Sequence, residues 1–237
     1  PQNLDRTLGG HCLADVSRRG KYLLLDFGHG HLLIHLGMSG SLRLVAATLP
    51  AEKHDHFDLV FTVKGKAVAL RLRDPRRFGA ILWLKGDPLK HPLLAGLGVE
   101  PLTEDFSAAW LKSELAGLSA AIKPTLMDSH RMVGIGNIYA SESLFRAGIN
   151  PRAAAGRISL KRLERLVPAI KATLAAAIDA GGSSLRDFIH SDGSSGYFQQ
   201  QYFVYGRSGE PCHVCGRPIR EMRQGQRATF FCAHCQR

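Results

Sequence analysis

The first part of the chain consists of short apolar runs separated by glycines, whereas apolar residues further along recur at helical spacing. Short runs rich in Leu, Ile, Val and Phe and bounded by glycines are typical of β-strands. We expect strands over Lys21–Phe27, His31–Leu36, Ser41–Val45, Phe57–Val63, Ala67–Arg73 and Ala80–Leu84. Consecutive short strands with no helix between them favour a β-sandwich or a barrel.

The later pattern predicts a helical region. Asp87–Pro101 is rich in proline and glycine, so we expect it to link the strands to that region. We expect helices over Asp105–Ala116, Ala121–Met127, Ile138–Ala147 and Leu160–Ala180. Pro168 predicts a kink in the last helix or a later start, because proline lacks the N–H that a helix interior uses. Ser183–Gly206 is polar and predicts an irregular loop.

The net charge of the chain indicates the kind of partner that it binds. The chain of 237 residues carries 31 Lys and Arg against 20 Asp and Glu, a net charge of +11. Such an excess favours a polyanionic partner. A hydrophobic content of 45% excludes a wholly disordered chain. No apolar run approaches the roughly 20 residues that cross a bilayer, and we find no signal peptide, so we expect a soluble intracellular protein.

Four of the five cysteines form two Cys-x-x-Cys pairs near the end of the chain: Cys212, Cys215, Cys232 and Cys235. Each pair places two thiolates on one tight turn, and two such turns complete the tetrahedral sulfur set that Zn²⁺ prefers. Four protein ligands leave no open position, so we expect one structural Zn²⁺. His213 and His234, inside the pairs, are alternative ligands, and disulfides are a further alternative.

Three other features favour contact with nucleic acid. The cysteine module is rich in arginine, whose planar fork matches phosphate oxygens, although a solvated basic surface has the same composition. The turn Asp74–Gly79 places Arg76 and Arg77 beside Phe78, which suits either a wedge between bases or an ordinary turn with a buried Phe. Gly134–Asn137 precedes a predicted helix, where Asn137 would cap the helix and free amides would face an anion.

Taken together, these segments resemble the formamidopyrimidine-DNA glycosylases, bacterial base-excision enzymes that remove oxidised purines. The segments that carry the resemblance are Lys21–Leu25, His35–Gly40, Lys53–His56, Asp74–Gly79, Ile122–Pro124, Gly134–Glu142, Ser191–Phe198 and the four paired cysteines. The resemblance implies a multi-domain α+β fold. Its expected parts are a β-sandwich domain over residues 1–100, a helix-two-turn-helix domain with a lesion-capping loop over 101–204, and a zinc finger over 205–237.

The resemblance also implies the activity and the residues that carry it. The family acts on damaged double-stranded DNA as glycosylase and AP lyase, excising 8-oxoguanine or formamidopyrimidines and cleaving the abasic strand by β,δ-elimination. The damaged nucleotide is extruded from the duplex, because its glycosidic bond is unreachable inside the stack. We expect a monomer in the bacterial cytoplasm, associated with the nucleoid through DNA.

The site residues that the resemblance implies fall into four groups. DNA contacts are expected at His35, His54, Arg76, Lys123, Asn137 and Arg227, with Lys21 beside them. Intercalation is expected from Met38, Arg76 and Phe78. The lesion loop is expected to comprise Ser191, Asp192, Gly193, Ser194, Gly196 and Tyr197. Lys21 and Arg227 are expected to donate protons or position phosphate during elimination.

The start of the printed sequence departs from the family pattern. The family begins Pro-Glu-Leu-Pro-Glu, with the proline amine as nucleophile and the glutamate as proton shuttle, whereas this sequence opens Pro1-Gln2. We interpret this as the absence of about thirty-five residues, including the catalytic start, and we expect the chain as given to be inactive. The alternatives are a non-catalytic damaged-DNA-binding module and a zinc-ribbon RNA-binding protein.

Overall fold

The computed structural model describes residues 3–180 and 202–237. The chain divides into two compact units, which we describe separately. Among the described residues, the β unit comprises residues 3–95, and the helix–finger unit comprises 96–180 together with 202–237.

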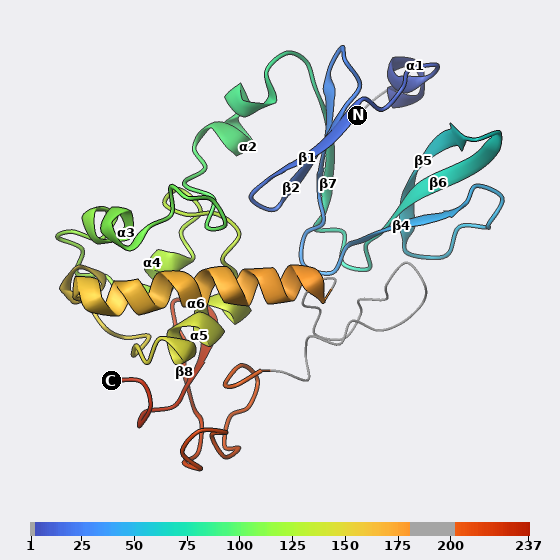
Figure 1. Ribbon diagram of the computed structural model, residues 1–237. Coiled ribbons are helices and arrows are strands. Elements are labelled where there is room, and N and C mark those ends of the chain that lie inside the picture. The colour runs from blue at the N-terminus through green and yellow to red at the C-terminus, as the bar shows by residue number, and fades with distance from the viewer. Residues whose placement is uncertain (1–2, 181–201) are drawn as a thin grey trace. The chain divides into compact units, whose positions relative to one another are not determined.

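The β unit contains two antiparallel sheets (Figure 1). The first sheet has the order β1 (Asp15–Arg19), β2 (Tyr22–Asp26), β3 (His31–His35) and β7 (Ala80–Leu84). The second sheet has the order β4 (Ser41–Ala46), β6 (Lys66–Arg73) and β5 (Asp55–Val63). A short helix, α1 (Leu4–Leu8), precedes the first strand, and η1 (Pro88–Lys90) and α2 (Pro92–Ala95) follow the last one.

The two sheets share one apolar core. Leu25, Leu32 and Ile34 of the first sheet pack in the same cluster as Leu59 of the second, and α1 adds Leu8. Burial of these side chains on facing surfaces is what holds two sheets together in a sandwich. The predicted β-sandwich is therefore confirmed.

Every predicted strand is present with ends within two residues of the prediction, but the sequence pattern missed β1. Its residues Asp15–Arg19 are exposed apart from the half-buried Arg19. Among the described strands, it lies at the edge of its sheet and pairs only with β2, from Asp15 opposite Asp26 to Arg19 opposite Tyr22. A strand that buries neither face leaves no alternation to detect, so local pattern could not reveal it.

The helix–finger unit is built around one long helix, α6 (Leu160–Asp179). Its buried stripe of Leu163, Leu166 and Ile170 packs in one cluster with residues of α3 (Ala108–Glu114), α4 (Ile122–Leu126) and α5 (Asn137–Arg146). A 3-10 turn, η2 (Ala155–Arg157), precedes α6. The predicted helical domain is confirmed. None of the described helices has the length and apolar character needed to cross a membrane.

The helix α6 continues through Pro168. The alternative of a later start was therefore wrong, because the helix begins at Leu160. Buried residues lie on both sides of the proline, from Leu163 to Ala177. Packing of this apolar stripe outweighs the loss of one backbone hydrogen bond at the proline.

The last two strands, β8 (Arg220–Gln224) and β9 (Arg227–Phe231), form a β-hairpin. The two-residue turn between them contains Gly225 at φ 58°, a conformation that favours glycine. Val204, Ile219 and Phe230 form a small core with Phe145 at the end of α5. The hairpin is thus packed directly against the helical part of its own unit.

Candidate nucleic-acid interface and zinc centre

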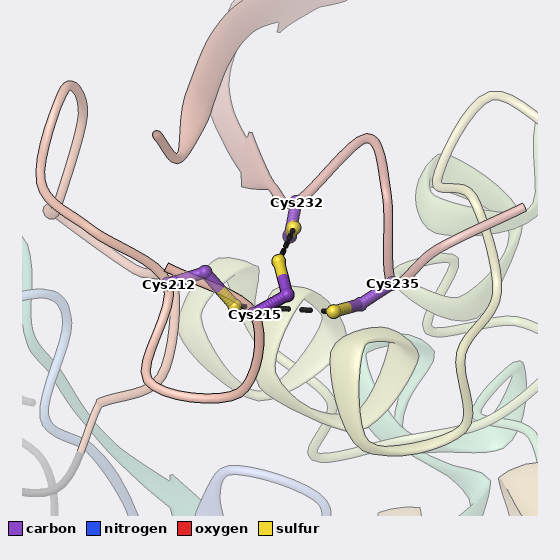
Figure 2. A group of neighbouring side chains, drawn as sticks. All are labelled: Cys212, Cys215, Cys232 and Cys235. Atoms are coloured by element: carbon purple, nitrogen blue, oxygen red, sulfur yellow. Dashed lines mark hydrogen bonds between the residues drawn. The ribbon is translucent and has the colours of Figure 1, made fainter. Parts of the chain in front are cut away.

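The sulfurs of Cys212, Cys215, Cys232 and Cys235 converge on one point (Figure 2). All four lie within 4.8 Å of one another, with 3.9 Å between Cys212 and Cys235 and 3.5 Å between Cys215 and Cys232. Zn–S bonds of about 2.3 Å in a tetrahedron place sulfurs about 3.8 Å apart, whereas a disulfide requires about 2.05 Å. The geometry fits one structural Zn²⁺, as predicted, and does not fit disulfides.

Backbone turns hold the thiolates in place. The Gly216 N–H donates to the Cys212 carbonyl at 2.8 Å, and Gly216 adopts φ 72° to close that turn. His213 packs edge-on against Phe203 with ring centroids 6.1 Å apart, and the metal-binding group found among the described residues contains neither His213 nor His234. The alternative that a histidine replaces a cysteine ligand is therefore not supported.

Gln236 connects the zinc centre to the helices. Its Oε1 accepts from the Cys232 N–H at 2.8 Å, and its Nε2 donates to the Ile149 carbonyl at 2.9 Å. The side chain is buried, so both contacts are shielded from water. Sequence reasoning missed this residue, because a polar residue beside a cysteine has no distinctive pattern.

Lys123 joins three segments that lie far apart in the sequence. Its Nζ donates to Asn137 Oδ1 at 2.6 Å, to Thr229 Oγ1 at 2.7 Å and to the Ala228 carbonyl at 3.0 Å. The side chain is only 1% exposed. Burial, with a smaller effect from the Arg227 charge, lowers the pKa of Lys123 to about 8. The first turn of α5 and the finger hairpin therefore meet at one cationic group.

Asn137 does not cap its helix, contrary to the prediction. The N-cap is Gly136, and no side chain caps this end of α5. Instead, the Asn137 amide accepts from Lys123 and donates to the Ala228 carbonyl at 3.0 Å and to the Tyr205 hydroxyl at 3.3 Å. The ammonium of Lys123 is a stronger partner for the amide oxygen than a backbone N–H, which explains the difference.

A small cavity opens beside this cluster. It has a volume of about 240 Å³ and is lined by Lys123, Pro124, Met127, Asp128 and Gln224–Arg227. Arg227 begins β9 and is exposed, next to the two hairpin residues that bind Lys123. The structure thus brings together three of the predicted DNA-contact residues, Lys123, Asn137 and Arg227.

Glu142 is a second buried charge. It ends a segment that carries the family resemblance, but sequence reasoning gave it no role. It lies on α5, is 1% exposed, and accepts from three successive backbone N–H groups at 2.9–3.0 Å, those of Phe203, Val204 and Tyr205. The carboxylate fixes the stretch that leads into the finger. Ser141 and Ser143 are buried on either side of it, so the sequence has no uniform apolar stripe that would have set Glu142 apart.

In the β unit, the predicted residues gather around two turns. His35 ends β3, and its Nδ1 accepts from the Gly37 N–H at 3.2 Å. Burial, followed by the nearby Lys21 charge, lowers the pKa of His35. Lys21 directly precedes β2. The His54 carbonyl accepts from the Asp74 N–H at 2.9 Å, which places His54 beside the second turn.

The two predicted wedge side chains are exposed. Met38 is 72% exposed and Phe78 is 57% exposed. The Arg76 guanidinium lies 4.7 Å from the centroid of the Phe78 ring. The alternative of an ordinary turn with a buried Phe was therefore wrong. The predicted lesion loop, Ser191–Tyr197, lies outside the described residues.

Comparison with known families matches most of the chain. "Formamidopyrimidine-DNA glycosylase N-terminal domain" matches residues 1–81, "Formamidopyrimidine-DNA glycosylase H2TH domain" matches 97–189, and "Zinc finger found in FPG and IleRS" matches 209–237. The formamidopyrimidine-DNA glycosylase of Aromatoleum aromaticum is 62% identical over 237 residues, covering 100% of this chain and 86% of the relative. That of Janthinobacterium sp. is 55% identical, with the same coverage of both chains.

Solved structures give the same result. The MutM (Fpg) protein of Thermus thermophilus is similar with a TM-score of 0.83 at 38% identity, covering 96% of this chain and 84% of the other. The Lactococcus lactis Fpg in complex with DNA containing an abasic site is similar with a TM-score of 0.88 at 35% identity, covering 99% and 86%.

Proposed function

The chain belongs to the formamidopyrimidine-DNA glycosylase family, and on this premise we propose that it serves base-excision repair of oxidised purines in duplex DNA. The reaction is that of a DNA glycosylase and AP lyase: excision of 8-oxoguanine or formamidopyrimidine bases, followed by β,δ-elimination at the abasic site. The Lactococcus lactis relative that was solved with DNA containing an abasic site supports this substrate class.

The observation that carries the proposal is that Lys123 and Arg227 line one cavity and that Asn137 is hydrogen-bonded to Lys123. An ammonium, an amide and a guanidinium together suit a DNA phosphate. Lys123 has three N–H donors, and its present partners use all of them. Binding of phosphate by Lys123 thus requires the exchange of one protein acceptor for a phosphate oxygen.

The remaining assignments follow the same proposal. His35, His54 and Lys21 contact the DNA backbone from the β unit, and Met38, Arg76 and Phe78 fill the space that the extruded nucleotide leaves. Lys21 and Arg227 donate protons or position phosphate during elimination, and Ser191–Tyr197 covers the extruded base. The proposed domains are residues 1–100, 101–204 and 205–237. The protein acts on DNA as a monomer in the bacterial cytoplasm.

The glycosylase reaction also needs a nucleophile, which is a separate requirement from DNA binding. The 237 residues contain no Pro-Glu-Leu-Pro-Glu sequence, and Pro1 is followed by Gln2, which cannot shuttle a proton as a glutamate does. We propose that a polypeptide of this sequence alone binds damaged duplex without excising the base. In that form it would act as a damaged-DNA-binding module, which is the second candidate function.

Binding of duplex DNA should fall steeply with salt, and Arg227→Ala should reduce the slope of log affinity against log salt by about one. Each phosphate contact releases roughly one counterion, so the loss of one contact removes roughly one unit of slope. Fluorescence anisotropy over a series of salt concentrations measures it. Arg165→Ala, an exposed arginine on α6, is the matched control for net charge. An affinity independent of salt, or an unchanged slope in Arg227→Ala, would contradict the assignment.

Affinity for DNA should also decrease as the pH rises above about 8. In the free chain the pKa of Lys123 is lowered to about 8, so the ammonium is present below that pH and is lost above it. A phosphate favours the charged form, so binding above this pH requires proton uptake and weakens by up to about tenfold per pH unit.

The pH test compares wild type with Lys123→Arg between about pH 7 and 9.5, because a guanidinium stays charged throughout this range. Lys112→Arg is the control, because Lys112 Nζ donates to the Gly156 and Ile158 carbonyls. This variant should keep the wild-type pH profile. A flat wild-type curve would count against a phosphate contact at Lys123. NMR titration of the Lys123 side chain gives its pKa directly.

A further inference from the structure

Two turns of the β unit lie against each other, and each exposes one large apolar side chain. The turn at residues 36–40 joins β3 to β4 and carries Met38, and the turn at residues 74–79 joins β6 to β7 and carries Phe78. A Cβ added at Gly37 would lie 2.6 Å from the Phe78 carbonyl carbon, so the two backbones are in direct contact. The side chains assigned to one wedge therefore come from two separate segments.

One buried carboxylate, that of Asp74, binds both turns. Its Oδ2 accepts from the Gly79 N–H at 2.7 Å, and its Oδ1 accepts from the Arg76 N–H at 3.3 Å. The same Oδ1 accepts from the Ser39 hydroxyl at 3.1 Å, across to the first turn. Asp74 is only 2% exposed. Its side chain thus links Ser39, next to Met38, with Arg76 and Gly79, which lie before and after Phe78.

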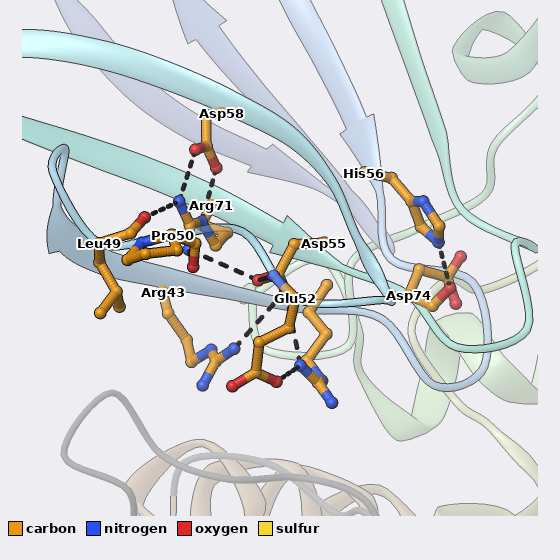
Figure 3. Close-up of polar contacts among 10 residues, drawn as sticks. Arg43, Leu49, Pro50, Glu52, Asp55, His56, Asp58, Arg71 and Asp74 are labelled. Atoms are coloured by element: carbon orange, nitrogen blue, oxygen red, sulfur yellow. Dashed lines mark hydrogen bonds and ion pairs between the residues drawn. The ribbon is translucent and has the colours of Figure 1, made fainter.

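The Asp74 backbone connects a third segment. Its N–H donates to the His54 carbonyl at 2.9 Å, and its carbonyl lies 3.0 Å from His56 Nε2 (Figure 3). His54 is the residue assigned to a DNA phosphate. Asp74 therefore binds the turn at residues 36–40, stabilises its own turn at residues 74–79, and holds the segment of the residue proposed to contact a phosphate.

The turn at residues 74–79 has a strained backbone, which the hydrogen bonds to Asp74 stabilise. Arg77 adopts φ 56°, a left-handed conformation that costs energy for a residue other than glycine. A Cβ at Gly79 would lie 2.9 Å from the His35 carbonyl oxygen and 3.0 Å from Asp74 Oδ2. Hydrogen bonds to the carboxylate offset this cost and fix where Phe78 points.

Asp74 stays ionised in this position. Burial alone would raise its pKa, but hydrogen bonds from Gly79, Ser39, Arg76 and Arg77 outweigh burial and lower the pKa of the carboxyl. Both oxygens therefore act as acceptors. An asparagine keeps one oxygen acceptor, so if that oxygen faces the Gly79 N–H, its N–H₂ group faces the Arg76 N–H, which cannot accept, and the Ser39 hydroxyl must reverse from donor to acceptor. The substitution therefore replaces charge-assisted hydrogen bonds with weaker or repulsive contacts and loosens the link between the turns.

A second ionic cluster in the β unit provides a control. Arg71 donates to both Asp58 oxygens at 2.8 Å, and to the Leu49 and Pro50 carbonyls at 2.8 and 2.9 Å (Figure 3). Asp58 accepts its side-chain hydrogen bonds from Arg71 and, among the residues that the structure describes, has none to either of the two turns. Asp58→Asn therefore removes a carboxylate from the same unit without touching Met38 or Phe78.

We propose that Asp74 is a positioning residue that makes Met38 and Phe78 act as one wedge, and that it thereby sets the preference of the protein for lesion-bearing over intact duplex. This inference rests on the proposed function. Insertion of a wedge costs least at a damaged pair, so a wedge held rigidly discriminates better than two independently mobile side chains.

The test measures the ratio of affinities for an 8-oxoguanine duplex and the matched guanine duplex, with the zinc-loaded full chain. We expect Asp74→Asn to reduce this ratio by about tenfold, similar to Phe78→Ala, and Ser39→Ala to reduce it by about threefold. Asp58→Asn should lower the melting temperature but leave the ratio unchanged. If Asp74→Asn and Ser39→Ala lower only stability, or if Asp58→Asn lowers the ratio equally, the inference is wrong.

A measurement without DNA separates this inference from the proposed function. In Ser39→Ala the amide of Gly79 should exchange with solvent several-fold faster, although residue 39 lies in the other turn; an unchanged rate would overturn the link through Asp74. If wild type shows no preference for the lesion, the proposed function fails, and the Gly79 amide still decides whether Asp74 couples the two turns. Ser39→Ala also serves as the second variant if Asp74→Asn does not fold.

Discussion

A polypeptide of these 237 residues should give no covalent adduct when it is mixed with an abasic-site duplex and borohydride. Formation of a Schiff base needs an amine placed at the sugar C1′ and a group that moves the proton. Gln2 does not transfer protons, and a lysine placed beside DNA phosphates, as proposed for Lys21, is held in its charged form. We expect the adduct yield to be lower by more than about a hundredfold than that of a version beginning with the Pro-Glu-Leu-Pro-Glu segment of the family.

The comparison needs two controls. Both versions must bind the abasic duplex, which anisotropy measures before trapping, so that a missing adduct reports chemistry rather than binding. Lys21→Ala distinguishes the two amines that remain, because trapping that survives this substitution would point to Pro1. Efficient trapping by the 237-residue chain would show that it carries its own nucleophile and would refute the second candidate function, that of a binding module without excision.

Removal of zinc should unfold the C-terminal finger and abolish specific DNA binding. The four cysteines and the small core of Val204, Ile219 and Phe230 are too few to fold a hairpin without the metal. Structural zinc contributes about 10–16 kcal/mol to folding in comparable finger peptides. We expect one zinc per chain by elemental analysis, and loss of it in the double variant Cys215→Ser and Cys232→Ser.

Cys12→Ser is the matched control for the zinc prediction, because Cys12 is exposed and lies outside the metal-binding group. It should retain both zinc and DNA affinity. Most of the helical circular dichroism should survive in the double variant, since the α3–α6 core contains none of the finger residues. Unchanged zinc content in that variant would disprove the Cys₄ site.

The features that the sequence predicted are those with a local physical cause. Strands such as His31–His35 bury an apolar run between glycines, and helices such as Leu160–Asp179 repeat apolar residues at helical spacing. The zinc ligands were predictable for the same reason, because each pair of thiolates needs only one tight turn. The residue types left open whether the Asp74–Gly79 turn acts as a wedge, and the proposed wedge and phosphate residues were assigned from the order of the family's motifs along the chain.

Strands and hydrogen bonds that depend on partners far away in the sequence could be seen only in the tertiary structure. The edge strand Asp15–Arg19 is held by β2 and not by burial, so it has no periodicity of its own. Asn137 binds Lys123 and Ala228 instead of capping its helix, and Glu142 and Asp74 collect donors from segments that local sequence does not connect. Such contacts join residues up to 106 positions apart. Their partners are selected by the packing of the whole unit, where a buried polar group must find an acceptor or donor, and no local pattern records which one it finds.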